Sequence, residues 1–222
     1  GNCRLPIVVK TDGLASGKGV VIAETREVAL STIKSMFNGK FSIAGKPIVI
    51  EEFLRGEELS YFVLCDGKTL LPMGSAQDHK KAFNGDKGPN TGGMGAYSPA
   101  PILTKSLEKT ILSKIIKPTI DIMNSKNLPF VGLLYAGLMI KNEEPNLIEY
   151  NVRFGDPECQ VLMMRLGGQI LDVLLNCAEH KLNQSKINWA NDSAISVVMA
   201  AKGYPENYKT GSVIKNIFSA EN

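Results

Sequence analysis

Short apolar runs and one amphipathic segment alternate through the first part of the chain. Residues 7–10 and 19–23 are rich in β-branched side chains and predict two strands, and residues 47–53 predict a third. Apolar side chains between residues 27 and 37 recur at helical spacing, and Thr25 stands where a helix N-cap is expected. The pattern therefore predicts three strands and one helix in this part of the chain.

The next hydrophobic pattern is a hairpin followed by a long glycine-rich stretch. Residues 59–65 and 69–71 are apolar runs on either side of Asp66-Gly67, a dipeptide typical of tight turns between strands. Residues 74–101 predict a long loop. Because loops of this length inside a compact domain usually carry function, we expect functional residues within it.

The second half of the chain alternates helical and strand patterns. Helices are predicted at residues 104–127, 158–165 and 169–180, and strands at residues 131–141, 147–153 and 195–201. Pro118 is expected to kink the first helix or to divide it in two, and residues 142–146 are expected to form a turn. Helices mixed with antiparallel hairpins predict an α+β or α/β fold.

Composition and charge narrow the class of partner. The chain carries 25 Lys and Arg against 22 Asp and Glu, a net charge of +3, so we expect no nucleic-acid partner. The four cysteines form no C-x-x-C pair, which is typical of reduced thiols in a cytoplasmic protein. Apolar runs are too short for a membrane span, so none is expected. The chain begins without Met and almost at once enters a predicted strand, and we expect it to be part of a longer protein.

The segment TDGLASGKGVVIA has the composition of a phosphate-binding loop. It is not a Walker A loop, because only three residues separate Gly13 from Gly17 and because Gly19 follows Lys18 where Ser or Thr is required. It is expected to join two strands, so no helix N-terminus would face a phosphate. Two interpretations stay open here: a flap that holds a polyphosphate with its backbone, Lys18 and Lys10, or a glycine hairpin with solvated lysines.

A row of polar side chains follows the predicted strand at residues 147–153. Alternation along the strand places Glu149, Asn151 and Arg153 on one face. The intervening apolar residues form the expected core face: Ile148, Tyr150 and Val152. Glu149 and Asn151 offer oxygen donors that suit Mg²⁺ together with phosphate oxygens and water. The alternative is an ordinary solvated strand face, but the acidic turn at residues 155–158 favours a site.

Five segments together identify a family. They are KTDGLASGKGV at 10–20, EEFLRGEELS at 51–60, QDHKKAFNGDKGPNTGGMGAYSP at 77–99, LLYAGLMI at 133–140 and EYNVRFGDPE at 149–158. The chain resembles the phosphoribosylamine–glycine ligases, a family of ATP-grasp enzymes. The most specific segment is GPNTGGMGAYSP, which comes from a loop that varies widely among ATP-grasp enzymes. The likeness covers essentially the whole chain.

The resemblance implies an α+β fold of the ATP-grasp type, with two subdomains that grip ATP. Residues 1–66 would form the small lid subdomain, and residues 67–192 the large subdomain with the substrate loop and the metal site. Residues 193–222 would begin a C-terminal domain. An N-terminal domain and most of the C-terminal domain of the family are missing from this sequence.

The resemblance also implies roles for individual residues. The ATP-binding set is Lys10, Gly13, Ser16, Gly17, Lys18, Gly19, Glu51, Glu52, Phe53, Leu54 and Glu58. The set that lines the substrates is Asp78, Asn90, Thr91, Gly92, Gly93, Arg153 and Asp156. The metal ligands are Glu149 and Asn151, and the catalytic residues are Lys18 and Arg153. Asp156 and Glu158 could also support the site from behind.

The acidic pair Glu51-Glu52 supports the functional interpretation independently. Adjacent strand residues face opposite sides, so one of the two carboxylates would point toward the core side. A buried carboxylate without a partner is costly, so a partner such as Lys10, or a ligand, is required.

The implied reaction joins glycine to 5-phosphoribosylamine through a glycyl phosphate. ATP with Mg²⁺ or Mn²⁺ would drive it, and the products would be glycinamide ribonucleotide, ADP and phosphate. Two alternatives stay open: a fragment that binds ATP without turnover, and another ATP-grasp ligase or carboxylase.

Overall fold

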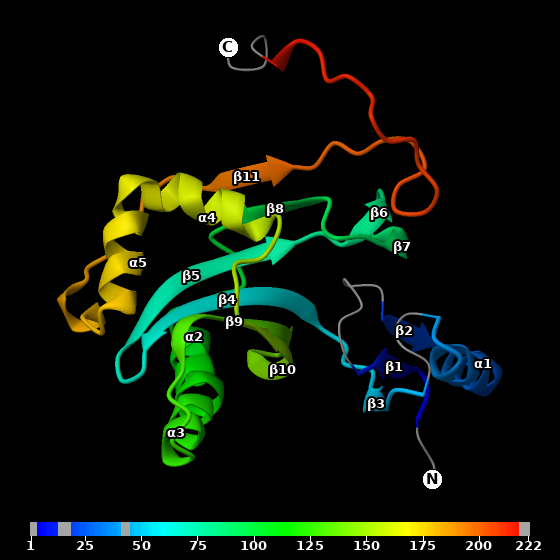
Figure 1. Ribbon diagram of the computed structural model, residues 1–222, viewed down its shortest axis with the longest axis horizontal. Helices are drawn as coiled ribbons and strands as arrows, with labels where there is room; N and C mark the ends of the chain where they lie inside the picture. Colours follow the sequence, from blue (N-terminus) through cyan, green and yellow to red (C-terminus); the bar gives the residue numbers. More distant parts are fainter. Residues whose placement is uncertain (1–3, 13–18, 41–44, 218–222) are drawn as a thin grey trace.

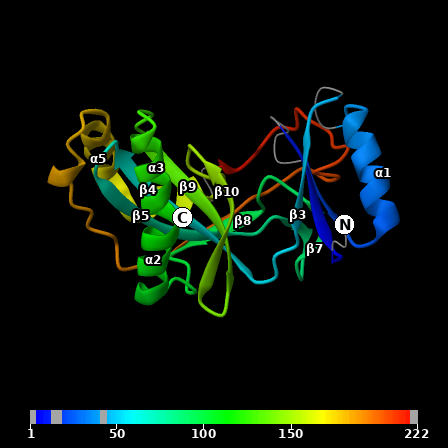
Figure 2. The ribbon, with the colours of Figure 1, turned by 90° about the horizontal axis from the view of Figure 1, so that it is seen from below.

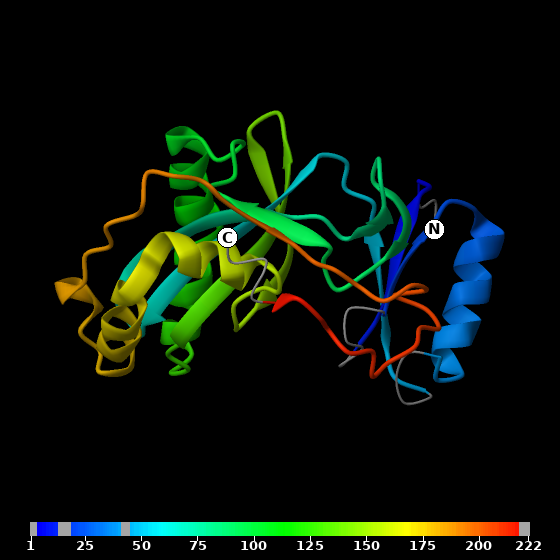
Figure 3. The same cartoon turned by 90° about the horizontal axis from the view of Figure 1, so that it is seen from above.

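The computed structural model of the chain describes residues 4–12, 19–40 and 45–217. These residues form two unequal halves, seen side by side in Figures 2 and 3. The smaller half is an antiparallel sheet of order β2-β1-β3 with one helix against it. Its elements are β1 (Ile7–Thr11), β2 (Val20–Ala23), α1 (Arg26–Phe37) and β3 (Ile48–Glu52).

The larger half is built on a six-stranded antiparallel sheet of order β10-β9-β4-β5-β8-β11. Its strands are β4 (Glu57–Asp66), β5 (Leu70–Asp78), β8 (Gly95–Ser98), β9 (Val131–Lys141), β10 (Glu144–Asn151) and β11 (Ala194–Val197). A separate hairpin projects beside the smaller half and consists of β6 (Lys81–Phe83) and β7 (Lys87–Asn90).

Helices cover both faces of the large sheet (Figure 1). One face carries α2 (Lys105–Ile111), the π-helical turn η1 (Leu112–Ile116) and α3 (Lys117–Ser125), and the other carries α4 (Glu158–Leu166), η2 (Gly167–Gln169), α5 (Ile170–Ala178) and η3 (Leu182–Gln184). Alternation along β4 supplies both cores, because Phe62 and Leu64 point to one face while Tyr61 and Val63 point to the other. All four side chains are at most 1% exposed.

Most elements predicted from the sequence are confirmed with small shifts of their ends. Thr25 is the N-cap of α1, and its side chain accepts a hydrogen bond from the Val28 N–H at 3.3 Å. The hairpin across Asp66-Gly67 joins β4 to β5. The turn between β9 and β10 is shorter than predicted, because Asn142 and Glu143 both adopt positive φ and close it between them.

The prediction that residues 74–101 form a long loop is wrong. The end of β5, the β6–β7 hairpin and β8 all lie within this range. Glycine-rich composition concealed these strands, since β8 reads GAYS and β7 reads KGPN without apolar alternation. β8 pairs with strands distant in sequence, β5 and β11, whereas β6 and β7 pair with each other as a local hairpin.

Pro118 does not divide the helix at residues 104–127. The helix runs on through η1, a π-helical turn that ends two residues before Pro118. Pro118 lies inside this continuous helical stretch and supplies no N–H to its hydrogen bonds. The wider turn before it absorbs the irregularity.

Thr104 caps α2, since its side-chain oxygen accepts a hydrogen bond from the Leu107 N–H at 3.1 Å. Replacing Thr104 by alanine is expected to lower the free energy of unfolding by about 1 kcal/mol, measured by urea denaturation. Thr110→Ala is the matched control, because the Thr110 hydroxyl donates only to the Ser106 carbonyl inside the helix. That control should change stability little, and equal losses in the two variants would contradict the capping role.

The change of sheet along the chain falls between β3 and β4. β4 pairs with β5 and β9 and thus belongs wholly to the large sheet, and β11 joins the same sheet through β8. The domain boundaries expected at residues 66 and 192 stay predictions.

One helical stretch among the described residues, Glu158–Ala178, meets the length and composition test for crossing a membrane. A single such helix is weak evidence. Its apolar character has another source in this fold, because Val161, Leu162, Val173 and Cys177 pack into the core beneath the large sheet.

Candidate active site

A cavity of about 800 Å³ lies between the two halves of the structure. Val8 and Lys10 line it from the small sheet, and Ser60 and Tyr135 line it from the large sheet. Seven carboxylates from the part of the chain that the structure describes line it: Glu51, Glu52, Glu58, Asp78, Glu149, Asp156 and Glu158. Three cations among the described residues line it: Lys10, Lys80 and Arg153. The wall therefore carries an excess of negative charge that cationic ligands would balance.

Lys10 and Glu51 form an ion pair at 2.6 Å on the small-sheet side of this cavity. β1 and β3 run antiparallel with Val8 opposite Glu51. Lys10 is two residues after Val8 and therefore shares the face on which Glu51 lies. The Lys10 side chain is only 16% exposed, so the pair is partly shielded from solvent. The expected buried carboxylate is not found, because Glu52, which shares the core-side face with Ile7, is exposed, and Lys10 instead pairs with Glu51 on the cavity face. Phe53 and Leu54 follow on the same wall.

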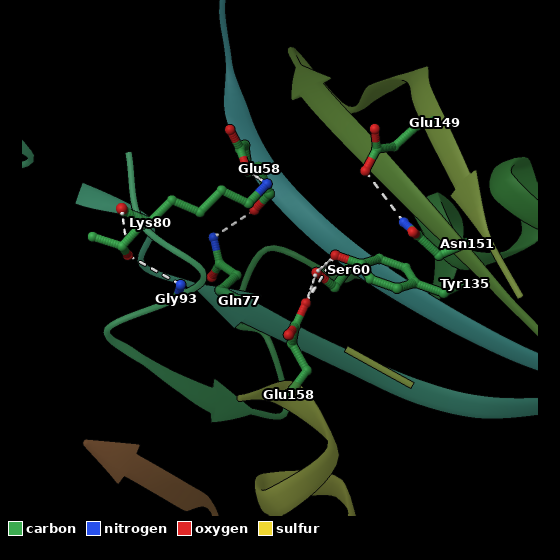
Figure 4. Close-up of polar contacts among 10 residues, drawn as sticks. Glu58, Ser60, Gln77, Lys80, Gly93, Tyr135, Glu149, Asn151 and Glu158 are labelled. Carbon is green, nitrogen blue, oxygen red and sulfur yellow. Dashed lines mark hydrogen bonds and ion pairs between the residues drawn. The ribbon is translucent and has the colours of Figure 1, made fainter. Parts of the chain in front are cut away.

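Lys80 is a cavity residue that the sequence patterns did not identify. Its Nζ lies 2.8 Å from the Glu58 carboxylate (Figure 4). Burial lowers the pKa of Lys80, but the charges of Glu58, Asp78 and Glu149 outweigh burial and raise the pKa above its usual value. The only sequence feature that could have indicated Lys80 is its position two residues after Asp78 in the QDHK segment.

Glu149 and Asn151 lie next to each other near the end of β10. The Asn151 amide donates to a Glu149 carboxylate oxygen at 3.2 Å, and both residues line the cavity (Figure 4). Among the described residues, no group of three or more His, Cys, Asp or Glu could hold a metal ion. Two oxygen donors on a cavity wall nevertheless fit Mg²⁺, which commonly keeps its waters and takes substrate phosphates as further ligands.

The two faces predicted for the strand at residues 147–153 are only partly correct. A bulge between Leu147 and Glu149 shifts the register against β9, and Ile148 lines the cavity. Tyr150 does pack into the core. Val152 is 71% exposed, because β10 ends at Asn151.

Arg153 also lies beyond the end of β10. It lines the cavity, and its Nη1 donates to the Phe154 carbonyl at 2.8 Å. No acidic partner holds its guanidinium among the described residues. The remaining N–H groups can therefore face a ligand.

Glu158 is almost fully buried, at 2% exposure, and it is held by two hydroxyl groups. The Tyr135 hydroxyl donates to its Oε1 at 2.8 Å and the Ser60 hydroxyl at 3.0 Å (Figure 4). The sequence patterns did not identify Ser60 and Tyr135 as residues of the site. β4 and β9 are neighbours, and this brings the two hydroxyls together beneath the start of α4.

Asp78 ends β5 with one carboxylate oxygen buried and without a hydrogen-bond partner. Burial raises the pKa of Asp78 to about 7, and the nearby Glu158 charge adds to this. Gly93 crosses directly above it at a positive φ, and a Cβ there would lie 2.9 Å from Asp78 Oδ1 and 2.4 Å from Pro157 Cδ. Only glycine fits this crossing.

The other predicted substrate residues gather near Asp78. Asn90, the last residue of β7, lines the cavity together with Thr91 and Gly92, which follow it. Asp156 also lines it, is exposed, and accepts a hydrogen bond from Gln160 at 2.9 Å. Gly19 lies outside the cavity lining, and its carbonyl accepts a hydrogen bond from the Thr11 N–H at 2.9 Å. The predictions for Gly13, Ser16, Gly17 and Lys18 lie outside the described residues.

Comparison with known proteins identifies the family that carries this arrangement. Residues 2–159 match the family described as phosphoribosylglycinamide synthetase, ATP-grasp (A) domain. The chain belongs to this family. A relative from Brucella melitensis biotype 1, named phosphoribosylamine–glycine ligase, is 54% identical over 216 residues, 97% of this chain and 51% of the relative.

One solved structure agrees with this family assignment, and a second shares the fold alone. The crystal structure of phosphoribosylamine–glycine ligase from Thermotoga maritima matches with a TM-score of 0.81 and 32% identity, covering 92% of this chain and 51% of that one. The biotin carboxylase domain of the Hydrogenobacter thermophilus 2-oxoglutarate carboxylase, solved with MgADP, shares the fold at a TM-score of 0.62 and 18% identity, covering 86% of this chain and 41% of that one. The α+β ATP-grasp fold is therefore confirmed. The chain spans about half the length of the relatives compared here.

Proposed function

We propose that the protein containing this chain is a cytoplasmic ligase that joins glycine to 5-phosphoribosylamine at the expense of ATP. The observation that carries the proposal is the convergence of the family's separate segments on one cavity. Four strands that are separated in the sequence place one residue each in the same space: Lys10, Glu51, Asp78 and Glu149. Family membership and this convergence support the ligase over another ATP-grasp carboxylase or ligase.

The reaction proceeds in two transfers. A carboxylate oxygen of glycine attacks the γ-phosphorus of ATP, and the bond to the leaving ADP breaks. The amine nitrogen of 5-phosphoribosylamine then attacks the carbonyl carbon of glycyl phosphate and expels phosphate, and the nitrogen loses a proton. Both steps depend on charge neutralisation and positioning more than on covalent chemistry by the protein.

Each wall of the cavity has a role in this proposal. Lys10, Lys18 and the segment around Glu51 hold ATP, and Glu58 takes the ribose hydroxyls. Asp78, Asp156, Arg153 and the turn at residues 90–93 face glycine and 5-phosphoribosylamine, with Arg153 directed at a phosphoryl or carboxylate oxygen. Glu149 and Asn151 would hold Mg²⁺ or Mn²⁺, which on binding neutralises phosphate charge.

The charge of the cavity supports a cation requirement. Among the described residues, the wall has seven carboxylates against three cationic side chains, and a nucleoside triphosphate adds further negative charge. Additional positive charge is needed to bring these groups together. A divalent ion and the amino groups of the substrates would supply it.

The decisive experiment measures ADP release that depends on both glycine and 5-phosphoribosylamine. It is made with the longest natural chain that contains this sequence and with the 222-residue chain itself, beside calorimetry with ATP and Mg²⁺. We expect turnover in the longer chain. Binding of ATP without turnover in both chains would instead support a nucleotide-binding module.

Asn151→Ala tests the position of the site within that assay. We expect it to lower the rate of ADP release, whereas Asn146→Ala should leave the rate unchanged. Both asparagines lie on β10, but Asn146 is exposed, lies outside the cavity lining and donates only to the Glu144 carbonyl at 3.5 Å. Equal rates in the two variants would show that the site is wrongly placed.

A further inference from the structure

The segment that follows β11 folds into a compact turn beside the β6–β7 hairpin (Figures 1 and 3). Within it, the Tyr204 N–H donates to the Ala201 carbonyl at 3.1 Å, and the rings of Tyr204 and Tyr208 meet edge to face at 5.4 Å. Gly203 has a φ of 100°, and a Cβ there would lie 2.4 Å from the Asn207 carbonyl oxygen. This turn therefore has a defined internal structure.

The Tyr204 side chain connects this turn to the cavity wall. Its hydroxyl oxygen accepts a hydrogen bond from the Gly92 N–H at 3.1 Å, across 112 positions of sequence. Gly92 lines the cavity, and a Cβ at this position would lie 3.3 Å from the Tyr204 oxygen. The contact is therefore close, and it reaches the wall where the acceptor substrates are proposed to bind.

The backbone N–H groups of residues 91, 92 and 93, the first two on the cavity wall, are each held by a different acceptor. The Thr91 N–H donates to the Lys80 carbonyl at 2.7 Å, and the Thr91 hydroxyl donates to the same carbonyl at 2.8 Å. The Gly93 N–H donates to the Thr91 side-chain oxygen at 3.0 Å. The Gly92 N–H is the one whose acceptor, Tyr204, comes from outside the β5–β8 region.

Lys80 links Thr91 to Glu58, which is proposed to hold the ribose of ATP. Thr91 is fixed to the Lys80 backbone, and the Lys80 ammonium is paired with Glu58. Gly92 and Gly93 give this stretch of backbone conformational freedom, which hydrogen bonds must restrict. The hydroxyl of Tyr204 thus fixes Gly92, which lies between Thr91 and Gly93, the two residues held by hydrogen bonds from within the same segment.

We propose that Tyr204 is a positioning residue for glycine and 5-phosphoribosylamine, acting through the Gly92 N–H on the cavity wall. The inference rests on the proposed ligase function. Among the described residues, the Tyr204 hydroxyl is hydrogen-bonded to Gly92 and to none of the proposed ATP-binding residues, so it should govern the KM of glycine and 5-phosphoribosylamine and leave ATP binding alone.

Tyr204→Phe in the longest natural chain that contains this sequence tests the proposal, since it removes one oxygen and keeps the ring. Losing one hydrogen bond corresponds to a rise of about 3- to 10-fold in the KM of glycine or 5-phosphoribosylamine. We expect kcat, the KM of ATP and the Tm to stay unchanged. Tyr208→Phe is the matched control, because it keeps the same ring contact and its hydroxyl has no hydrogen bond among the described residues.

Three results would overturn the proposal: unchanged KM values for both acceptor substrates, an equal rise in the KM of ATP, or an equal effect of Tyr208→Phe. A parent protein without substrate-dependent ADP release would refute the proposed function itself. A parent that is active, with a Tyr204→Phe variant indistinguishable from it, would refute only the role of Tyr204.

Discussion

Glu149→Ala is expected to reduce the rate of ADP release by about 100-fold or more, a loss of about 2.7 kcal/mol of transition-state stabilisation. Glu149 is one of two oxygen donors beside each other on the cavity wall, and its removal leaves Asn151 alone to hold a divalent ion. Because the ion is then bound more weakly, a higher Mg²⁺ concentration should restore part of the rate. The measurement is the rate of ADP release as a function of Mg²⁺ concentration.

Glu144→Ala provides the matched control for this prediction. Glu144 begins the same strand, lies outside the cavity lining, and makes only an exposed ion pair with Lys114 at 3.5 Å. Its replacement should leave both the rate and the Mg²⁺ dependence unchanged, because exposed pairs contribute little. A Glu149→Ala variant with the Mg²⁺ dependence of the parent would exclude Glu149 as a metal ligand.

Asp78→Asn is expected to stabilise the chain at pH 8 and to have little effect near pH 4. Asp78 has its pKa raised from 3.8 to about 7 in the fold, so the folded state binds its proton more tightly than the unfolded state. This contribution to stability is complete below about pH 4, falls as pH rises, and is lost above about pH 7. The full shift corresponds to about 4 kcal/mol, and solvent screening around this partly exposed carboxyl reduces the expected effect to about 2 kcal/mol.

Thermal unfolding of parent and variant at pH 4 and pH 8 checks the sign. Asp121→Asn is the control, since Asp121 is exposed and paired only with Lys117 on α3, at 2.7 Å. We expect this control to change the Tm little at either pH. A Tm difference between parent and Asp78→Asn that is the same at both pH values would mean that the Asp78 carboxyl does not titrate in this range.

The sequence predicted a large share of the candidate site because the residues sit in recognisable local patterns. Glu149 and Asn151 alternate on a strand, and Lys10 and Glu51, both singled out in the sequence, form an ion pair. Lys80 and Tyr135 escaped prediction, because one stands in a glycine-rich segment and the other in an apolar strand. Their contacts depend on which strands are neighbours in the sheet.

The sequence by itself determined the antiparallel hairpins, the N-cap at Thr25 and the family, since turn chemistry, periodicity and motif spacing depend on residues close together in the chain. Only the tertiary structure decided the course of residues 74–101, because β8 takes its place in the sheet by pairing with β5 on one side and with β11 on the other. It also decided the Ser60–Glu158 and Gly92–Tyr204 contacts, which span 98 and 112 positions. Such contacts arise from how strands pack, and a hydroxyl or an N–H carries no local mark of a partner so far away.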